Sequence, residues 1–381
     1  MNVYLFVIAC LVIFMFIELN NPRKNQKLLF VIGCALIFSI IAFRGSDVGG
    51  DTSAYIDFFT GRGSMYGTID DSEMEVGFVL IARFLHFFNE SAMWFLFSST
   101  LITLFPFFII VKKYSSNKTI PLLLFMTTWS ILPTSLCAIR QNFAVSLAMT
   151  AFLLFGSLRD NSIQDVKKRK SIIISIIIVC ILSIMTHTSM MVALPLIVLA
   201  EFINLSRKYM YIIVLGSFVG ALLIDTLFGV LFQQFNIITQ SFEYADRMNS
   251  YFENSKYELT NEVSFNRLGP STLYVLIVVY KSSEEELHSF FLKCLVIGHS
   301  LFCIGASFPM ISRVVYPLLL FGISFVPLSM NFRREKISKV LLILLLFFFV
   351  RTQFKYFAEY NISDNYYGVR LLPYKTIFEE L

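Results

Sequence analysis

The chain has 381 residues, of which 56% are hydrophobic and only 15% are charged, and its mean hydropathy is +0.71. A soluble domain carries charge on roughly a quarter of its residues, so this composition excludes a soluble fold and indicates an integral membrane protein. The net charge of +5 is small, and the basic residues lie in short loops between apolar runs. That distribution is not typical of nucleic-acid-binding proteins, in which basic residues gather on one face.

Apolar runs near membrane-spanning length follow one another along the whole chain. Because a helix needs roughly 20 apolar residues to cross the hydrocarbon core, the runs predict an all-α, polytopic membrane protein with about 12 transmembrane helices. We expect a single transmembrane domain, residues 1–381. In the first run the positive charges follow the apolar stretch, which predicts a retained helix rather than a signal peptide. The predicted spans are 3–19, 27–43, 92–111, 119–136, 139–157, 171–186, 189–203, 209–233, 269–281, 287–304, 309–329 and 336–352.

The basic loops predict the orientation of the chain. If the spans alternate, the basic clusters all fall on one side, which the positive-inside rule makes cytoplasmic. The longest of them is the run 167–170, which is Lys-Lys-Arg-Lys. The opposite side then holds the segments 44–75, 234–268 and 353–381, which we expect to be periplasmic or external.

The segment 76–89 does not fit this alternation. It is apolar but short, and both of its flanks belong outside. We therefore expect a helix that lies in the outer leaflet or enters it as a re-entrant segment.

Common motifs of soluble enzymes are absent from the sequence: it holds no HExxH, Walker, GxSxG or GxGxxG pattern. The 6 cysteines lie in or beside apolar segments and form no CxxC pair. We expect neither a metal nor another cofactor.

Polar residues instead stand at the predicted outer ends of the spans. Arg44 ends one apolar run, and glycines after it allow a tight turn that gathers Asp47, Asp51 and Tyr55. The planar, permanently charged guanidinium of arginine binds phosphate well, so several arginines at one membrane face indicate an anionic lipid headgroup, such as that of a pyrophosphate-linked lipid. The other candidates at outer span ends are Arg140, Gln141, His187, Ser189, Arg313, Tyr316 and, in the tail, Tyr374.

These motifs resemble those of the EpsG family, which groups with Wzy-type polysaccharide polymerases. The string FRGSDVGGDTSAYIDFF resembles the family's N-terminal signature of Arg, Gly, Asp and Tyr, with Gly50 where a small or hydroxyl residue is usual. Weaker matches follow in order: EVGFVLIARFL with Glu75 and Gly77, IRQNFAVSLA with Arg140 and Gln141, THTSMMVALPL with His187 and Ser189, SRVVYP with Arg313 and Tyr316, and PYK with Tyr374.

The resemblance implies a polymerase of O-antigen, capsule or exopolysaccharide repeats in the bacterial inner membrane. Such a glycosyltransferase moves a growing glycan from undecaprenyl pyrophosphate onto the next lipid-linked repeat at the outer face, and it needs no cofactor. A multi-span glycosyltransferase-like fold is then expected, with a flippase and a chain-length regulator as partners. The alternatives are a flippase of the lipid-linked repeat and an O-antigen ligase.

The reaction assigns tasks to the candidate residues. A pyrophosphate leaving group needs its charge stabilised, for which Arg140 and Arg313 are the first choices. The acceptor hydroxyl needs a base, with Asp51, Asp47, Glu75 and His187 as candidates. The residues expected to bind substrate are Arg44, Tyr55, Arg140, Gln141, Ser189, Arg313, Tyr316 and Tyr374.

Overall fold

The computed structural model describes residues 2–20, 26–72, 74–128, 131–159, 165–239, 265–305, 309–326, 347–351 and 374–379. Within these residues the regular structure is helical, and the only β contacts are isolated bridges from Arg44 to Thr376 and from Ser64 to Gly67. The all-α prediction is thus confirmed. The helices are α1 (Asn2–Asn20), α2 (Gln26–Ala42), α3 (Thr52–Phe59), α4 (Val76–Phe88), α5 (Ala92–Tyr114), α6 (Thr119–Thr127), α7 (Ile131–Cys137), α8 (Ile139–Arg159), α9 (Val166–Thr186), α10 (Met190–Phe202), α11 (Arg207–Thr239), α13 (Phe265–Lys281), α14 (Glu284–Leu287), α15 (Phe290–Ile304), α16 (Pro309–Ile323) and the 3₁₀ turn η2 (Ile377–Glu379).

Four of the described helices are long and apolar enough to cross a membrane, namely Val3–Asn20 of α1, α5, α8 and α9. The chain is therefore a membrane-embedded helical protein, but its helix lengths do not establish 12 crossings. The predicted span 119–136 is not one helix: α6 and α7 are bent by 72° relative to each other. Elsewhere a described helix overlaps every predicted span, although 336–352 is described only at its end. The predicted outer segments 234–268 and 353–381 lie largely outside the described residues.

Phenylalanine is abundant, with 42 of 381 residues, and many of these rings pack against one another. Inside the bundle, Phe152 of α8 stacks on Phe290 of α15 with ring centroids 4.6 Å apart, and Phe321 of α16 meets both rings edge-on. Edge-to-face and offset aromatic pairs stabilise a core beyond the area that they bury. These contacts hold α8, α15 and α16 together where lipid supplies no hydrophobic driving force.

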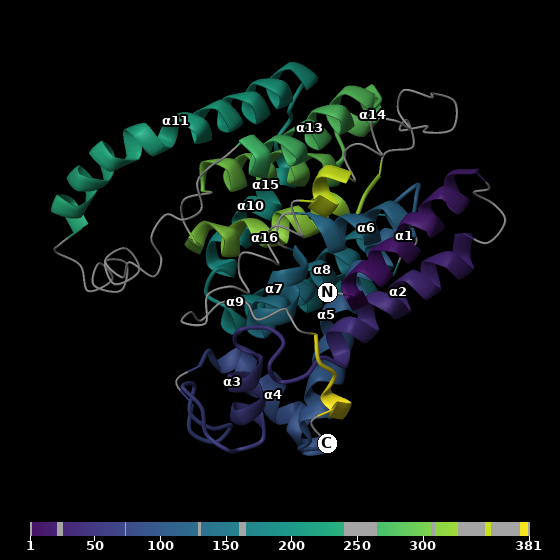
Figure 1. Ribbon diagram of the computed structural model, residues 1–381, viewed down its shortest axis with the longest axis vertical. Helices are drawn as coiled ribbons and strands as arrows, with labels where there is room; N and C mark the ends of the chain where they lie inside the picture. The colour runs from purple at the N-terminus through teal and green to yellow at the C-terminus, as the bar shows by residue number, and fades with distance from the viewer. Residues whose placement is uncertain are drawn as a thin grey trace.

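A smaller unit made of α3 and α4 lies at one end of the bundle (Figure 1). It has its own apolar core, in which Phe59 of α3 stacks on Phe95 of α5 with centroids 4.5 Å apart and Phe78 of α4 contacts Phe58 and Phe143. The helix predicted at 76–89 is present as α4. Its place in the outer leaflet stays a prediction.

Gly77 allows α4 to pack directly on the backbone of α9. A Cβ at this position would lie 2.7 Å from the carbonyl carbon of Met185 and 2.8 Å from the amide nitrogen of Thr186. This close approach places the start of α4 beside the residues that follow α9. The glycine therefore positions Glu75 near His187.

Gly77→Ala is expected to destabilise the protein because backbone atoms cannot move aside as a flexible side chain can. Overpacking of this kind costs about 1–3 kcal/mol. Thermal unfolding in detergent measures the effect. Gly216→Ala is the matched control, since a Cβ there meets nothing within 4 Å, and it should be neutral or slightly stabilising. Equal melting temperatures for the two variants would contradict this packing.

Candidate active site

Arg140, in the first turn of α8, is held by residues from two other segments. Its Nε donates to the hydroxyl of Tyr55 on α3 at 3.0 Å. Its Nη1 donates to Oε2 of Glu75, which precedes α4, at 2.6 Å, and each of these two ion-paired side chains is 21% exposed. The guanidinium is therefore fixed in place and partly shielded from water, while its Nη2 is the end that these contacts leave open.

Tyr66 completes this arrangement and was not among the residues predicted from the sequence. Its ring centroid lies 5.0 Å from the Arg140 guanidinium carbon, within cation–π range. It also stacks on Tyr55, with centroids 5.2 Å apart and planes 22° apart. Tyr66 lies in a tight turn closed by the Ser64–Gly67 bridge. No spacing pattern marked it, because a loop aromatic acquires its partners only through tertiary contacts.

The turn before α3 places Asp51. Gly49 has φ of +94°, and a Cβ there would lie 2.6 Å from the carbonyl oxygen of Leu136, so the turn packs against α7. The hydroxyl of Thr52 lies 3.2 Å from the same carbonyl oxygen. The half-buried Asp51 carboxylate makes no hydrogen bond or ion pair to the described part of the chain.

Burial raises the pKa of the Asp51 carboxyl above its ordinary value, while the positive charges of Arg313 and Arg140 partly offset this rise. A carboxylate with a raised pKa is more basic than one on the surface. Asp51 is therefore the one acid among the candidates that combines burial, basicity and an unoccupied oxygen pair.

Gln141 brings Arg313 into the same region. Its side-chain amide donates to the backbone carbonyl of Arg313 at 2.6 Å, which ties the start of α16 to α8. One turn further on, the Tyr316 hydroxyl lies 3.0 Å from Oγ of Ser135 on α7. The Arg313 side chain itself is exposed and forms no hydrogen bond or ion pair with residues that the structure describes. Gln141 and Tyr316 thus hold the helix that presents Arg313.

His187 ends α9 and is buried beside the same charges. Its Nδ1 accepts from the backbone N–H of Ser189 at 3.2 Å and lies 2.8 Å from Oγ of Ser189. Burial lowers the pKa of His187 to about 4; Glu75 opposes this shift, whereas Arg140 and Arg313 add to it. Because Nδ1 accepts an N–H, the neutral ring carries its proton on Nε2 and can donate it as a hydrogen bond.

Arg44, Asp47 and Tyr374 form a separate cluster where residues 374–379 dock on the end of α2. Arg44 is 2% exposed and donates to Ile41 O and, more weakly, to the Thr52 hydroxyl. The Tyr374 hydroxyl donates to Ile40 O at 3.1 Å. Burial lowers the pKa of Arg44 to about 10.

Asp47 lies at the outside of this cluster, where Lys375 Nζ is 3.6 Å from its Oδ2 and both side chains are about half exposed. The structure thus brings together Asp51, Tyr55, Glu75, Arg140, His187, Ser189 and Arg313, and it gives Arg44, Asp47 and Tyr374 other partners. The two guanidinium groups near Asp51 can bind a phosphorylated substrate, and the Asp51 carboxylate can accept a proton from that substrate or from a co-substrate.

The apolar helices and this polar cluster define a membrane-embedded protein whose site lies at one end of the bundle. The chain belongs to the EpsG family, whose model matches residues 27–376. The resemblance seen in the motifs is thereby confirmed over nearly the whole chain. Membership indicates a polymerase-type membrane protein of exopolysaccharide or O-antigen biosynthesis with glycosyltransferase-like activity. No curated protein and no solved structure matches the chain.

Proposed function

We propose that this protein polymerises a lipid-linked glycan, transferring the growing chain from undecaprenyl pyrophosphate to the next lipid-linked repeat at the outer face of the membrane. The observation that carries the proposal is the fixed guanidinium of Arg140 near Arg313 and the Asp51 carboxylate, neither of which pairs with a described side chain. This constellation supplies cations for a leaving pyrophosphate and a base for an attacking hydroxyl.

In the transfer, the acceptor hydroxyl oxygen forms a bond to the anomeric carbon of the donor glycan. The bond from that carbon to the pyrophosphate oxygen breaks, and the lipid pyrophosphate leaves with the bonding electrons. Asp51 takes the hydroxyl proton. Arg140 and Arg313 stabilise the negative charge that develops on the leaving group.

The other residues support these three. Glu75 is committed to Arg140 at 2.6 Å, so we assign it to positioning rather than to proton transfer. The Nε2–H of His187 is a donor, which suits it to a phosphate or sugar oxygen and not to the role of base. Tyr55 orients the Arg140 guanidinium by a hydrogen bond, and Tyr66 orients it by a cation–π contact.

The helix directions support an outward-facing site. Both α8 and α9 have 21 residues, so each extends roughly 31 Å. Arg140 and His187 stand at one end of this pair, and the basic run 167–170 stands at the other. With the basic run in the cytoplasm, the site faces the periplasm or the cell exterior.

Reporter fusions test this orientation. A fusion at Lys168 should read cytoplasmic, and one at Asp57 should read periplasmic or external, because the two positions flank opposite ends of the spans. Alkaline phosphatase and green fluorescent protein fusions give complementary readouts. A cytoplasmic signal at Asp57 would place the Asp51 turn on the wrong side and overturn the proposed site.

The polysaccharide profile of a deletion strain tests the function itself. A polymerase defect leaves a single-repeat product and removes the polymer ladder, and the gene supplied in trans restores the ladder. Loss of the single-repeat product as well would instead indicate a flippase or a ligase. The same strain serves as the host for every variant.

Tyr66→Ala is expected to slow polymer formation about twofold to thirtyfold, because a cation–π contact of about 0.5–2 kcal/mol no longer orients Arg140. Tyr66→Phe keeps the ring and should retain most of the rate. The assay is the initial rate of polymer formation in membranes at matched protein levels. Equal defects in the two variants would show that the hydroxyl, not the ring, carries the effect.

A further inference from the structure

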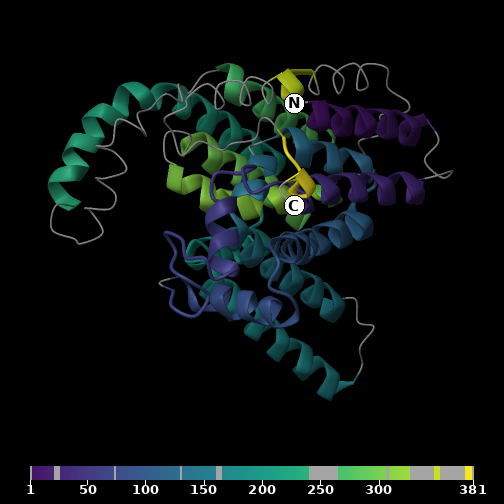
Figure 2. The same ribbon diagram turned by 60° about the horizontal axis from the view of Figure 1, so that its bottom comes forward.

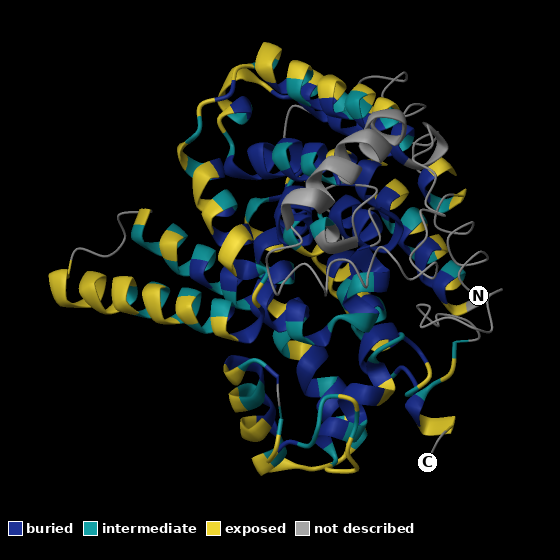
Figure 3. Ribbon diagram, turned by 90° about the vertical axis from the view of Figure 1, so that its left-hand side faces the viewer, coloured by how far each residue is buried: buried dark blue, intermediate teal, exposed yellow. Residues whose placement is uncertain are grey.

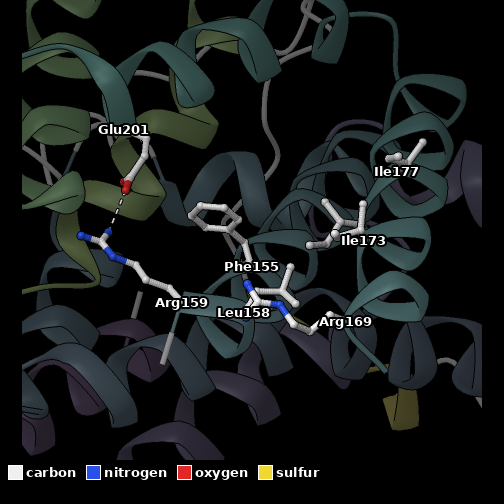
Figure 4. Close-up of a pocket in the computed structure, with 8 residues that line it drawn as sticks. Phe155, Leu158, Arg159, Arg169, Ile173, Ile177 and Glu201 are labelled. Atoms are coloured by element: carbon white, nitrogen blue, oxygen red, sulfur yellow. Dashed lines mark hydrogen bonds and ion pairs between the residues drawn. The ribbon is translucent and has the colours of Figure 1, made fainter. Parts of the chain in front are cut away.

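We propose that a cavity between α8, α9 and α10 binds one anionic glycerophospholipid of the cytoplasmic leaflet. The cavity has a volume of about 550 Å³, and Figure 4 shows the residues that line it. Its volume falls within the range of roughly 300–1,000 Å³ that is typical of small-molecule sites. It is lined by Phe155, Leu158, Arg159, Arg169, Ile173, Ile176, Ile177 and Glu201.

The cavity lies at the end of the α8–α9 hairpin opposite the candidate active site. Phe155 follows Arg140 by about four helical turns, roughly 22 Å along α8. Figure 2 shows this hairpin end projecting from the body of the protein. The orientation given by the basic run 167–170 puts the cavity at the level of the cytoplasmic headgroups.

The wall of the cavity is apolar and reaches lipid. Phe155 on α8 and Ile173 and Ile177 on α9 supply apolar side chains to the lining (Figure 4). Ile173 is 47% exposed and Ile177 is 53% exposed, and Figure 3 shows α9 exposed along most of its length. An acyl chain can enter such a groove sideways from the bilayer, whereas a soluble polar metabolite gains little from this wall.

The rim of the cavity is positively charged. Arg159 forms an ion pair of 2.8 Å with Glu201, which neutralises the only acid among the described residues that line the cavity. Lys293 adds a further positive charge nearby, since its Nζ donates to the backbone carbonyl of Glu201 at 2.9 Å. The Arg169 guanidinium forms no ion pair or hydrogen bond with the described residues, so none of them neutralises its charge directly.

The basic run beside the cavity does not stabilise its own helix. Lys167, Lys168, Arg169 and Lys170 occupy the first turns of α9, where positive charges oppose the helix dipole. Arg159 and Glu201 cancel each other, and Asp165 at the N-cap of α9 offsets one charge, so the run and Lys293 still leave a net positive charge beside the apolar groove. A negatively charged phosphodiester on an acyl tail complements both features, while a zwitterionic headgroup would bring its ammonium into the same field.

Lipid retention by the purified full-length protein tests the site. Native mass spectrometry after titration with phosphatidylglycerol or phosphatidylcholine counts the lipids that remain bound. The wild-type protein should hold one phosphatidylglycerol more tightly than any phosphatidylcholine. Arg169→Gln is expected to weaken that binding about tenfold or more, because a charge-assisted contact is lost.

Two matched controls separate a cavity site from diffuse surface charge. Lys170→Gln removes the same charge outside the lining and should weaken binding about fivefold at most. Ile177→Trp fills the cavity and should abolish tight retention, whereas Ile178→Trp, on an exposed neighbouring position, should not.

Equal losses in Arg169→Gln and Lys170→Gln would overturn the proposal, as would equal retention of phosphatidylcholine. Equal effects of the two tryptophan variants would overturn it as well. Polymer formation is not measured in this assay. The lipid-retention result can therefore be interpreted even if the proposed function is wrong.

Discussion

Asp51→Asn is expected to leave a stable, membrane-inserted protein that accumulates the single-repeat glycolipid and makes little or no polymer. The amide keeps the size of the side chain but cannot take the proton of the acceptor hydroxyl. A general base contributes about 10²–10⁴-fold to a rate, so the loss should be visible on gels. The measurement is the polymer ladder of the complemented deletion strain at matched protein levels.

The pH dependence of the wild-type protein gives a second readout of the same role. Burial raises the pKa of Asp51, so the basic form is present above that raised pKa and disappears as the pH falls through it. Polymer formation should therefore decline on the acid side, and the residual activity of Asp51→Asn should lack this decline. Asp47→Asn is the control, because its carboxylate pairs at the surface with Lys375. A normal ladder from Asp51→Asn would exclude Asp51 as the base.

Arg313→Ala is expected to abolish polymer formation, and Arg313→Lys should restore only part of it. An ammonium supplies the charge but not the planar pair of donors that matches a phosphate. We expect the lysine variant to be about tenfold or more below the wild type, since one charge-assisted hydrogen bond contributes about 1.5–3 kcal/mol. The readout is kcat and KM separately, in membranes supplied with lipid-linked repeats.

Arg140→Lys makes a useful comparison with Arg313→Lys. Arg140→Lys loses the hydrogen bond to Tyr55, the contact with the Tyr66 ring and the planar pair of guanidinium donors. This variant should therefore lower kcat more than it changes KM. The thermal stability of Arg313→Lys should differ little from that of the wild type, because the Arg313 side chain forms no bond with described residues. Wild-type ladders from both lysine variants would show that charge alone matters or that the residues are structural.

Hydropathy predicts most of the fold because the signal is long and local. Runs of apolar residues mark helices at almost every predicted position. The break between α6 and α7 was missed, although Pro133 lies in the first turn of α7. Proline is tolerated in a first turn because the N–H that it lacks would be unpaired there, so it was a usable sign of a helix start.

The candidate site is predictable only in part, because its members are selected by long-range contacts. Arg44 and Arg140 look alike in the sequence, since each stands at the outer end of an apolar run. In the structure Arg140 meets Tyr55 and Glu75, whereas Arg44 is bonded to Ile41 and Thr52. Glu75 and Asp51 likewise look equivalent in the sequence, but in the structure Glu75 pairs with Arg140 and Asp51 pairs with none of the described residues.

The docking of residues 374–379 has a consequence for how the protein matures. The amide of Gly45 donates to the carbonyl of Lys375 at 2.8 Å, and the amide of Ile377 donates to the carbonyl of Phe43 at 3.0 Å. The ribosome delivers this segment after all the described α-helices, and the segment holds residues 43–45, which lead into the Asp51 turn. Residues 43–45, which are synthesised early, are thus supported by residues 374–379, which are synthesised late. A nascent chain whose helices are all inserted, but in which residues 374–379 have not yet docked, would lack this support for the Asp51 turn. Membrane insertion and completion of the candidate active site would then be separate steps.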